Sequence, residues 1–184
     1  MTHALQDQYF IRPRTQLEET LLRTPELRRG LQWAHAAVGH PEPTVAHHVR
    51  AVLRNVDRAA VDARDRERLR LAAIVHDSFK YLAHRLGQPH GLLARRFLES
   101  YTDDVVLLEL VEWHDEVYLA WRLGYHHNDF VLARRRLDMV IRRFGDEISF
   151  YHRFFVCDTF AGDKNPKVVH WFESILGILQ VEVS

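Results

Sequence analysis

The sequence predicts an all-α protein of about eight helices in one domain, and three observations lead to this prediction. Apolar residues recur at intervals of three and four along most of the chain, which is the spacing of one helix face. Convincing runs of alternating apolar and polar residues, the mark of strands, are missing from the sequence. The length of 184 residues suits a single domain with its own core, and no internal repeat or long linker divides it.

Caps, prolines and glycines mark the ends of the expected helices. Thr24, Thr44 and Asp129 each stand directly before an apolar-periodic run, as N-cap residues do. Gly145 follows the helix that Asp129 begins. We expect a core at about residues 44–163, with the other helices packed on it. By approximate number the expected helices cover 15–38, 44–56, 62–86, 90–100, 102–124, 129–144, 148–161 and 166–180.

The composition argues against several classes of protein. The 25 basic residues balance the 25 acidic ones, so no overall charge favours nucleic acid or an anionic membrane. No stretch approaches the roughly 18 consecutive apolar residues of a transmembrane helix. Cys157 is the single cysteine, and its aromatic and apolar neighbours favour a core residue over a nucleophile. Because the first residues also lack the pattern of a signal peptide, we expect a soluble, cytoplasmic protein.

Titratable residues interrupt the apolar faces of four expected helices. Each lies on or beside a run of aliphatic or aromatic side chains that should form the core. An isolated charge there would cost free energy, so these groups should be paired or bound to a metal. Histidine is the commonest metal ligand, and the chain has 13 of them. The residues concerned are His48, His76, Asp77, His114 and Asp158.

The order of these residues resembles the HD-domain superfamily of metal-dependent phosphohydrolases. Its pattern is a His, then a His-Asp pair, then a distant Asp, and the resemblance covers about residues 44–163. His90 and His114 look like the two extra histidines of members that hold two metals. The resemblance implies an all-α core with one ion held by the four residues of the pattern. These four are His48, His76, Asp77 and Asp158.

In two-metal members of that superfamily the doublet aspartate bridges the ions, which implies a second ion held by Asp77, His90 and His114. Imidazole and carboxylate ligands suit Fe, Mn, Zn or Co, and we expect one or two such divalent ions. Two ions can lower the pKa of a shared water and stabilise the entering and leaving oxygens of a phosphoester. Members with a lysine at the place of Lys80 use it near the substrate phosphate, which implies the same role here.

Several assignments within this scheme stay open. His47 competes with His48 as the first ligand, although helix phase turns His47 nearly away from the apolar face. Lys80 can instead form a salt bridge with a neighbouring carboxylate. His90 can equally be an exposed first-turn residue, and His114 can be a core histidine bonded to a carbonyl.

Other polar residues are expected outside the ligand set. Asp115 and Glu116 are expected to face solvent or to orient the ligands, and His84 to lie at the surface. His126 and His127 are expected in a loop between helices. An arginine-rich helix face is expected to be solvated. The alternative is contact with phosphate or nucleic acid, with Arg135 or Arg136 able to reach into the pocket. These arginines are Arg134, Arg135, Arg136, Arg142 and Arg143.

We therefore expect a metal-dependent phosphohydrolase that cleaves a phosphoester of a nucleotide or related small phosphate ester with a metal-bound hydroxide. Asp77 would hold the ions together, and Lys80 would neutralise phosphate charge. Two alternatives are a di-iron oxygenase on the same ligands, as in one branch of the superfamily, and a metal-stabilised module that binds nucleic acid without turnover. No Gly-Tyr-Pro signature follows His114, which argues against cyclic-dinucleotide cleavage. The resemblance names no substrate.

Overall fold

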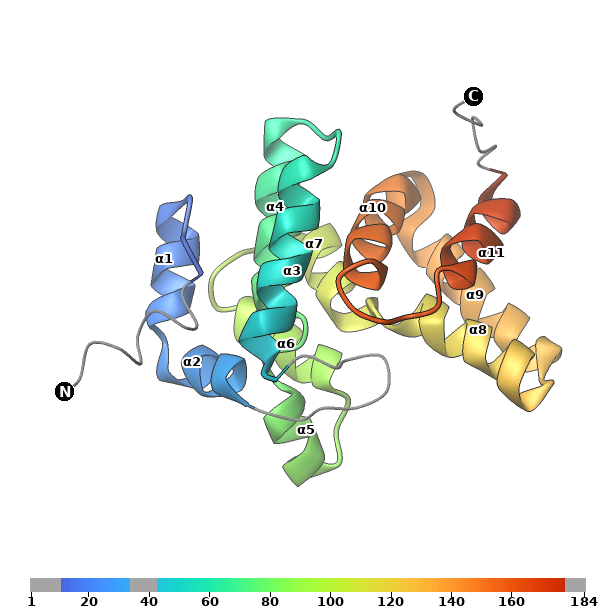
Figure 1. Ribbon diagram of the computed structural model, residues 1–184, viewed down its shortest axis with the longest axis horizontal. Helices are drawn as coiled ribbons and strands as arrows, with labels where there is room; N and C mark the ends of the chain where they lie inside the picture. Colours follow the sequence, from blue (N-terminus) through green and yellow to red (C-terminus); the bar gives the residue numbers. More distant parts are fainter. Residues whose placement is uncertain (1–10, 34–42, 178–184) are drawn as a thin grey trace.

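All regular secondary structure in the described parts of the chain, residues 11–33 and 43–177, is helical in the computed structural model (Figure 1). The prediction of an all-α fold is confirmed. The helices are α1 (Gln16–Arg23), α2 (Pro25–Gln32), α3 (Val45–Arg58), α4 (Ala63–Val75), α5 (Lys80–Leu86), α6 (His90–Leu98), α7 (Val105–Trp113), α8 (Glu116–His127), α9 (Phe130–Phe144), the short 3₁₀ helix η2 (Gly145–Glu147), α10 (Ile148–Thr159) and α11 (Lys167–Leu176).

Helices α3 and α4 lie at the centre of the bundle, with α1 and α2 on one side and α8 to α11 on the other (Figure 1). Helix α4 packs against α3, α7 and α10, and its last turns are completely buried. A buried ion pair fixes α1 to α4, because Arg70 Nε donates to Glu18 Oε1 at 2.7 Å. No helix among the described residues is both long and apolar enough to cross a membrane.

Two of the expected long helices are each divided in the structure. The helix expected at 62–86 becomes α4 and α5 with a turn at 76–79, and the helix expected at 102–124 becomes α7 and α8. Both breaks share the same side-chain contact. The Nδ1 atoms of His76 and His114 lie 3.0 and 2.8 Å from the carbonyls of Ala73 and Val111, three residues back. The ring thus occupies a carbonyl that would otherwise accept the next helical N–H.

Close backbone contacts hold both divided regions in place. A Cβ added to Gly30 of α2 would lie 1.6 Å from the carbonyl oxygen of Ser78, so α2 packs directly on the turn at 76–79. A Cβ on Gly91 of α6 would lie 2.3 Å from the carbonyl oxygen of Glu112 near the end of α7. Only glycine permits these approaches. Both contacts lie beside the histidines that end α4 and α7.

Several expected boundaries require correction. Helix α2 ends at Gln32 because Trp33 is extended, whereas the expected helix ran to residue 38; residues 34–42, with part of the expected linker, lie outside the described residues. Helix α8 continues past buried Gly124 to His127, so His126 and His127 are helical and not in a loop. Helix α9 has the expected bounds. Helix α10 ends at Thr159, and α11 ends at Leu176 rather than 180.

Candidate metal centre

Three helices bring the first group of ligand atoms together deep in the bundle. His48 Nε2 on α3 lies 2.9 Å from Asp158 Oδ1 on α10 and 3.3 Å from His76 Nε2 at the end of α4. Asp77 Oδ2 lies 3.5 Å from His76 Nε2 and 3.7 Å from His48 Nε2. No side chain of this first group is more than 4% exposed. The first group consists of His48, His76, Asp77 and Asp158.

A second group stands on the other side of Asp77. His90 Nε2 at the start of α6 lies 3.1 Å from His114 Nε2, and these two nitrogens lie 3.2 and 3.5 Å from Asp77 Oδ1. Asp115 Oδ2 lies 3.4 Å from His90 Nε2 and 3.6 Å from His114 Nε2. The second group consists of Asp77, His90, His114 and Asp115. It is the more open one, because the side chains of His90 and Asp115 are 20% and 30% exposed.

The hydrogen bonds found at the two helix breaks also determine the tautomers of two histidines. Because Nδ1 of His76 and of His114 donates to a backbone carbonyl, the neutral ring presents a lone pair at Nε2. Metal-binding histidines commonly have their second nitrogen held in this way. Both Nε2 atoms face the carboxylates of their group, so the two rings are oriented as ligands.

Asp77 connects the two groups through its two oxygens. Oδ2 faces the first group and Oδ1 the second, and Oδ1 is a buried oxygen that accepts no hydrogen bond from any described residue. Burial alone would raise the pKa of Asp77, but Lys80 and His76 outweigh it and hold that pKa well below the usual range. Lys80 offsets part of this charge from the Oδ2 side, but Oδ1 itself has no donor, which is unfavourable for a buried ionised oxygen unless a cation lies beside it.

The spacing of the ligand atoms fits bound metal ions. Imidazole nitrogens and carboxylate oxygens bind ions such as zinc at about 2.0–2.2 Å, which puts neighbouring ligands of one ion about 3–3.5 Å apart. The separations within the two groups run from 2.9 to 3.7 Å. Three overlapping clusters of these side chains are each compact enough to hold an ion. The donors are nitrogen and oxygen only, as transition ions such as Fe, Mn, Zn and Co accept.

Two lysines lie against the ligand carboxylates. Lys80 Nζ is 2.6 Å from Asp77 Oδ2, so the salt bridge considered as its alternative role does form. Lys164 Nζ is 2.5 Å from Asp158 Oδ2. Burial alone would lower the pKa of Lys164, but Asp158, Asp115 and Asp77 outweigh it and raise that pKa above the ordinary lysine value. Sequence reasoning missed Lys164, because it lies in the loop after α10, where no periodicity marks a face.

The remaining candidates divide between the site and the surface. His47 Nδ1 lies 2.9 Å from Thr44 Oγ1, so the structure places His48 and not His47 in the first group. Asp115 faces the second group and not only solvent, and no sequence signal marked it beyond its place after His114. His84 is exposed, as expected. Cys157 is buried, and burial raises the pKa of its thiol to about 11, which disfavours a nucleophilic role.

The arginines of α9 are engaged away from the ligands. Arg136 pairs with Glu116 at 2.5 Å, Arg134 with Asp138 at 2.8 Å, and Arg143 with Glu109 at 2.8 Å. Arg135 and Arg142 are exposed. None of these partners belongs to either ligand group, which agrees with a solvated helix face.

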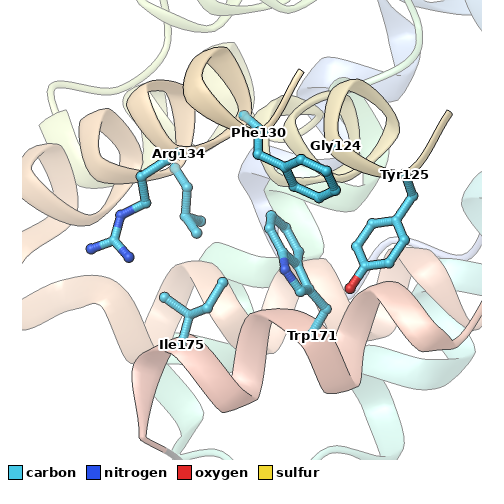
Figure 2. Close-up of a pocket in the computed structure, with 8 residues that line it drawn as sticks. Gly124, Tyr125, Phe130, Arg134, Trp171 and Ile175 are labelled. Carbon is cyan, nitrogen blue, oxygen red and sulfur yellow. The ribbon is translucent and has the colours of Figure 1, made fainter. Parts of the chain in front are cut away.

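A pocket of about 230 Å³ lies between α8, α9 and α11 and is separate from the ligand groups. Figure 2 shows Tyr125, Phe130 and Trp171 around it. Its place on α8 is nine or ten residues beyond Asp115, which is roughly 14 Å along the helix. The candidate chemistry therefore belongs to the ligand groups and not to this pocket.

No family model, curated protein or solved structure matches the chain. The side chains of the two groups are therefore the features of the molecule that indicate its function.

Proposed function

We propose that the protein is a metal-dependent phosphohydrolase that acts on a nucleotide or a related small phosphate ester. The observation that carries this proposal is the position of Asp77 between two pairs of histidines, with one carboxylate oxygen toward each pair. A carboxylate in this position can hold two ions side by side, an arrangement that recurs in enzymes that hydrolyse phosphate esters. The resemblance to the HD-domain superfamily supports the same reaction class.

The charges around the groups suit an anionic substrate. Three ligand carboxylates are partly balanced by Lys80 and Lys164, and two divalent ions would leave the centre with an excess of positive charge. Lys80 is 21% exposed and lies at the carboxylate that both groups share. Its ammonium group is thus available to a phosphate as well as to Asp77. This position supports the role of Lys80 in neutralising phosphate charge.

In the hydrolysis, the protein residues would bind the ions, orient the phosphate ester and exclude bulk water. The chemistry that two bound ions supply is Lewis acidity toward the phosphoryl oxygens and a water of lowered pKa. Asp77 would hold both ions, and His76 and His114 keep fixed orientations through their Nδ1 hydrogen bonds. The exposed edges of His90 and Asp115 define the side from which a phosphate ester can approach. One water is consumed, and the products are an alcohol and a phosphate.

Elemental analysis and a phosphate-release screen test this proposal. The purified protein should contain or accept a transition metal, and the metal-loaded protein should release phosphate from at least one nucleotide or small phosphate ester. Asp77→Ala should abolish this release, whereas Asp138→Ala, a change in a surface ion pair, should leave it unchanged. Absence of any metal binding, or release that survives Asp77→Ala, would contradict the proposal.

A di-iron oxygenase is the second candidate, because four histidines with carboxylates and no thiolate suit iron as well as zinc or manganese. Iron-loaded protein would then be coloured and would consume oxygen during turnover. A binding module without turnover would instead keep its metals and bind nucleic acid with a steep dependence on salt. Phosphate release without oxygen consumption separates the phosphohydrolase from both.

A further inference from the structure

Asp115 occupies the N-cap position of α8 without capping the helix. Its carboxylate accepts no hydrogen bond from the first turn of α8. The aspartates before three other helices do cap them: Asp62 accepts from Asp65 N–H, Asp104 from Leu107 N–H and Asp129 from Leu132 N–H. An N-cap aspartate normally stabilises its helix through such a bond. The side chain of Asp115 is therefore directed to something other than its own helix.

The carboxylate of Asp115 is directed at the two histidines of the second group. Its Oδ2 atom lies 3.4 Å from His90 Nε2 and 3.6 Å from His114 Nε2. The oxygen of Asp77 lies 3.2 and 3.5 Å from the same two nitrogens. Within the described residues, these nitrogens thus have a carboxylate oxygen from each of two aspartates beside them.

The ring atom that Asp115 faces distinguishes a ligand from an orienting residue. A carboxylate that orients a metal-binding histidine bonds the nitrogen that does not touch the metal. In His114 that nitrogen is Nδ1, and the carbonyl of Val111 already occupies it at 2.8 Å. Asp115 instead lies at Nε2, the atom that an ion would bind. A neutral ring has a lone pair at Nε2, and this lone pair and the two carboxylate oxygens repel one another unless a cation or a proton lies between them.

We propose that Asp115 is a ligand of the second ion, so that each ion has two imidazoles and two carboxylates, with Asp77 shared. The inference rests on the metal centre proposed above and adds to it a residue that the superfamily pattern does not supply. It assigns the second group a complete ligand set for a divalent transition ion such as Zn²⁺ or Co²⁺. It also makes the second group's affinity for its ion depend on a partly exposed side chain.

Titration of metal-free protein with Zn²⁺ or Co²⁺ tests the inference. Calorimetry and metal analysis should show two ions in the wild type. Asp115→Ala should leave the first ion unchanged and weaken the second by more than about 100-fold, beyond the 10–100-fold loss typical of residues that only orient a ligand. Asp115→Asn should also weaken it, because the amide has no charge. The Co²⁺ absorption spectrum of the second site should change in both variants.

Two controls make the result decisive. Glu116→Gln alters the neighbouring residue, which pairs with Arg136, and should leave both affinities unchanged. Asp115 caps no helix, but its charge stabilises those of His114 and Lys164, so metal-free Asp115→Ala should still fold and melt cooperatively, at a somewhat lower temperature than the wild type. Two ions bound with wild-type affinity in both Asp115 variants would overturn the inference alone. A wild type that binds no ion would overturn the proposed metal centre as well.

Discussion

The first and second groups contain the same kinds of ligand but differ in their surroundings. Each has two imidazoles, includes Asp77 and has one further aspartate, Asp158 or Asp115. Asp158 is 3% exposed and pairs with buried Lys164, whereas Asp115 is 30% exposed and has no lysine at hydrogen-bond distance among the described residues. The ring of Phe154 also packs edge-on against His76. The same types of ligand are thus found in a closed group and in a group that is open to solvent.

The largest expected effect comes from Asp77, because it belongs to both groups. Asp77→Ala should remove the bridge, prevent simultaneous binding of two ions and lower phosphate release by about 10³-fold or more. Metal analysis and initial rates on the same preparation measure both effects. Retention of two tightly bound ions by Asp77→Ala would show that the groups do not share a ligand.

The second largest effect should be a difference in stability between the two unshared aspartates. Asp158→Ala leaves the ammonium of Lys164 buried and unpaired, which should lower the free energy of unfolding of metal-free protein by about 3–5 kcal/mol. Asp115→Ala should lower it by less than Asp158→Ala does, because the Asp115 side chain is 30% exposed, although its charge helps to stabilise those of His114 and Lys164. Urea denaturation in the presence of a chelator measures both values.

A double variant refines the stability comparison. Replacing Lys164 with Met in the Asp158→Ala background removes the unpaired charge and should recover part of the lost stability. Equal destabilisation by Asp158→Ala and Asp115→Ala would contradict the distinction between a closed and an open group.

A chelator should remove the ions of the two groups at different rates. A chelator reaches the second group through the exposed edges of His90 and Asp115, whereas the first group is covered by protein. We expect one ion to leave first, and this ion should be the one that Asp115→Ala weakens. Stopped-flow chelation with a coloured indicator measures the two phases. A single phase that releases both ions together would contradict this order.

The smallest effect concerns the ion pair that joins the helices of the two groups. Arg68 on α4 bonds Asp104 at the start of α7 at 2.7 Å. Burial opposes ionisation of Asp104, but Arg68 and the N–H of Leu107 outweigh it and lower its pKa. Its stabilisation is therefore complete above the unfolded-state pKa of about 3.9 and is lost as the pH falls through the lower folded-state value.

Substitution of Asp104 measures this contribution. Asp104→Ala should lower the free energy of unfolding by about 1–2 kcal/mol at pH 7 through loss of the cap and the ion pair. The difference from wild type should shrink as the pH falls below the unfolded-state pKa of about 3.9. Urea denaturation at several pH values checks this trend, and metal content should stay unchanged. A difference that is constant down to pH 2 would contradict the assigned sign.

The spacing of His48, His76, Asp77, His90, His114 and Asp158 was enough to predict residues that the structure brings together. Helical periodicity could not reveal the breaks after α4 and α7, because the apolar pattern continues across both. For this reason Asp115 was expected to face solvent or to orient the ligands, and its position beside the Nε2 atoms of His90 and His114 was not predicted: on an unbroken helix it would lie about 100° from His114. Lys164 follows no periodic pattern, and its contact with Asp158 arises from tertiary packing alone.

The two imidazole rings that end α4 and α7 have a thermodynamic consequence for metal binding. Their rotation is restricted by the backbone as soon as the helices form, since Nδ1 is bound to a carbonyl three residues back. The entropy lost in orienting these two ligands therefore belongs to folding and not to association with the ion. Preorganisation of this kind favours tight binding with little rearrangement, so the metal-free and metal-loaded proteins should share one backbone conformation around His76 and His114.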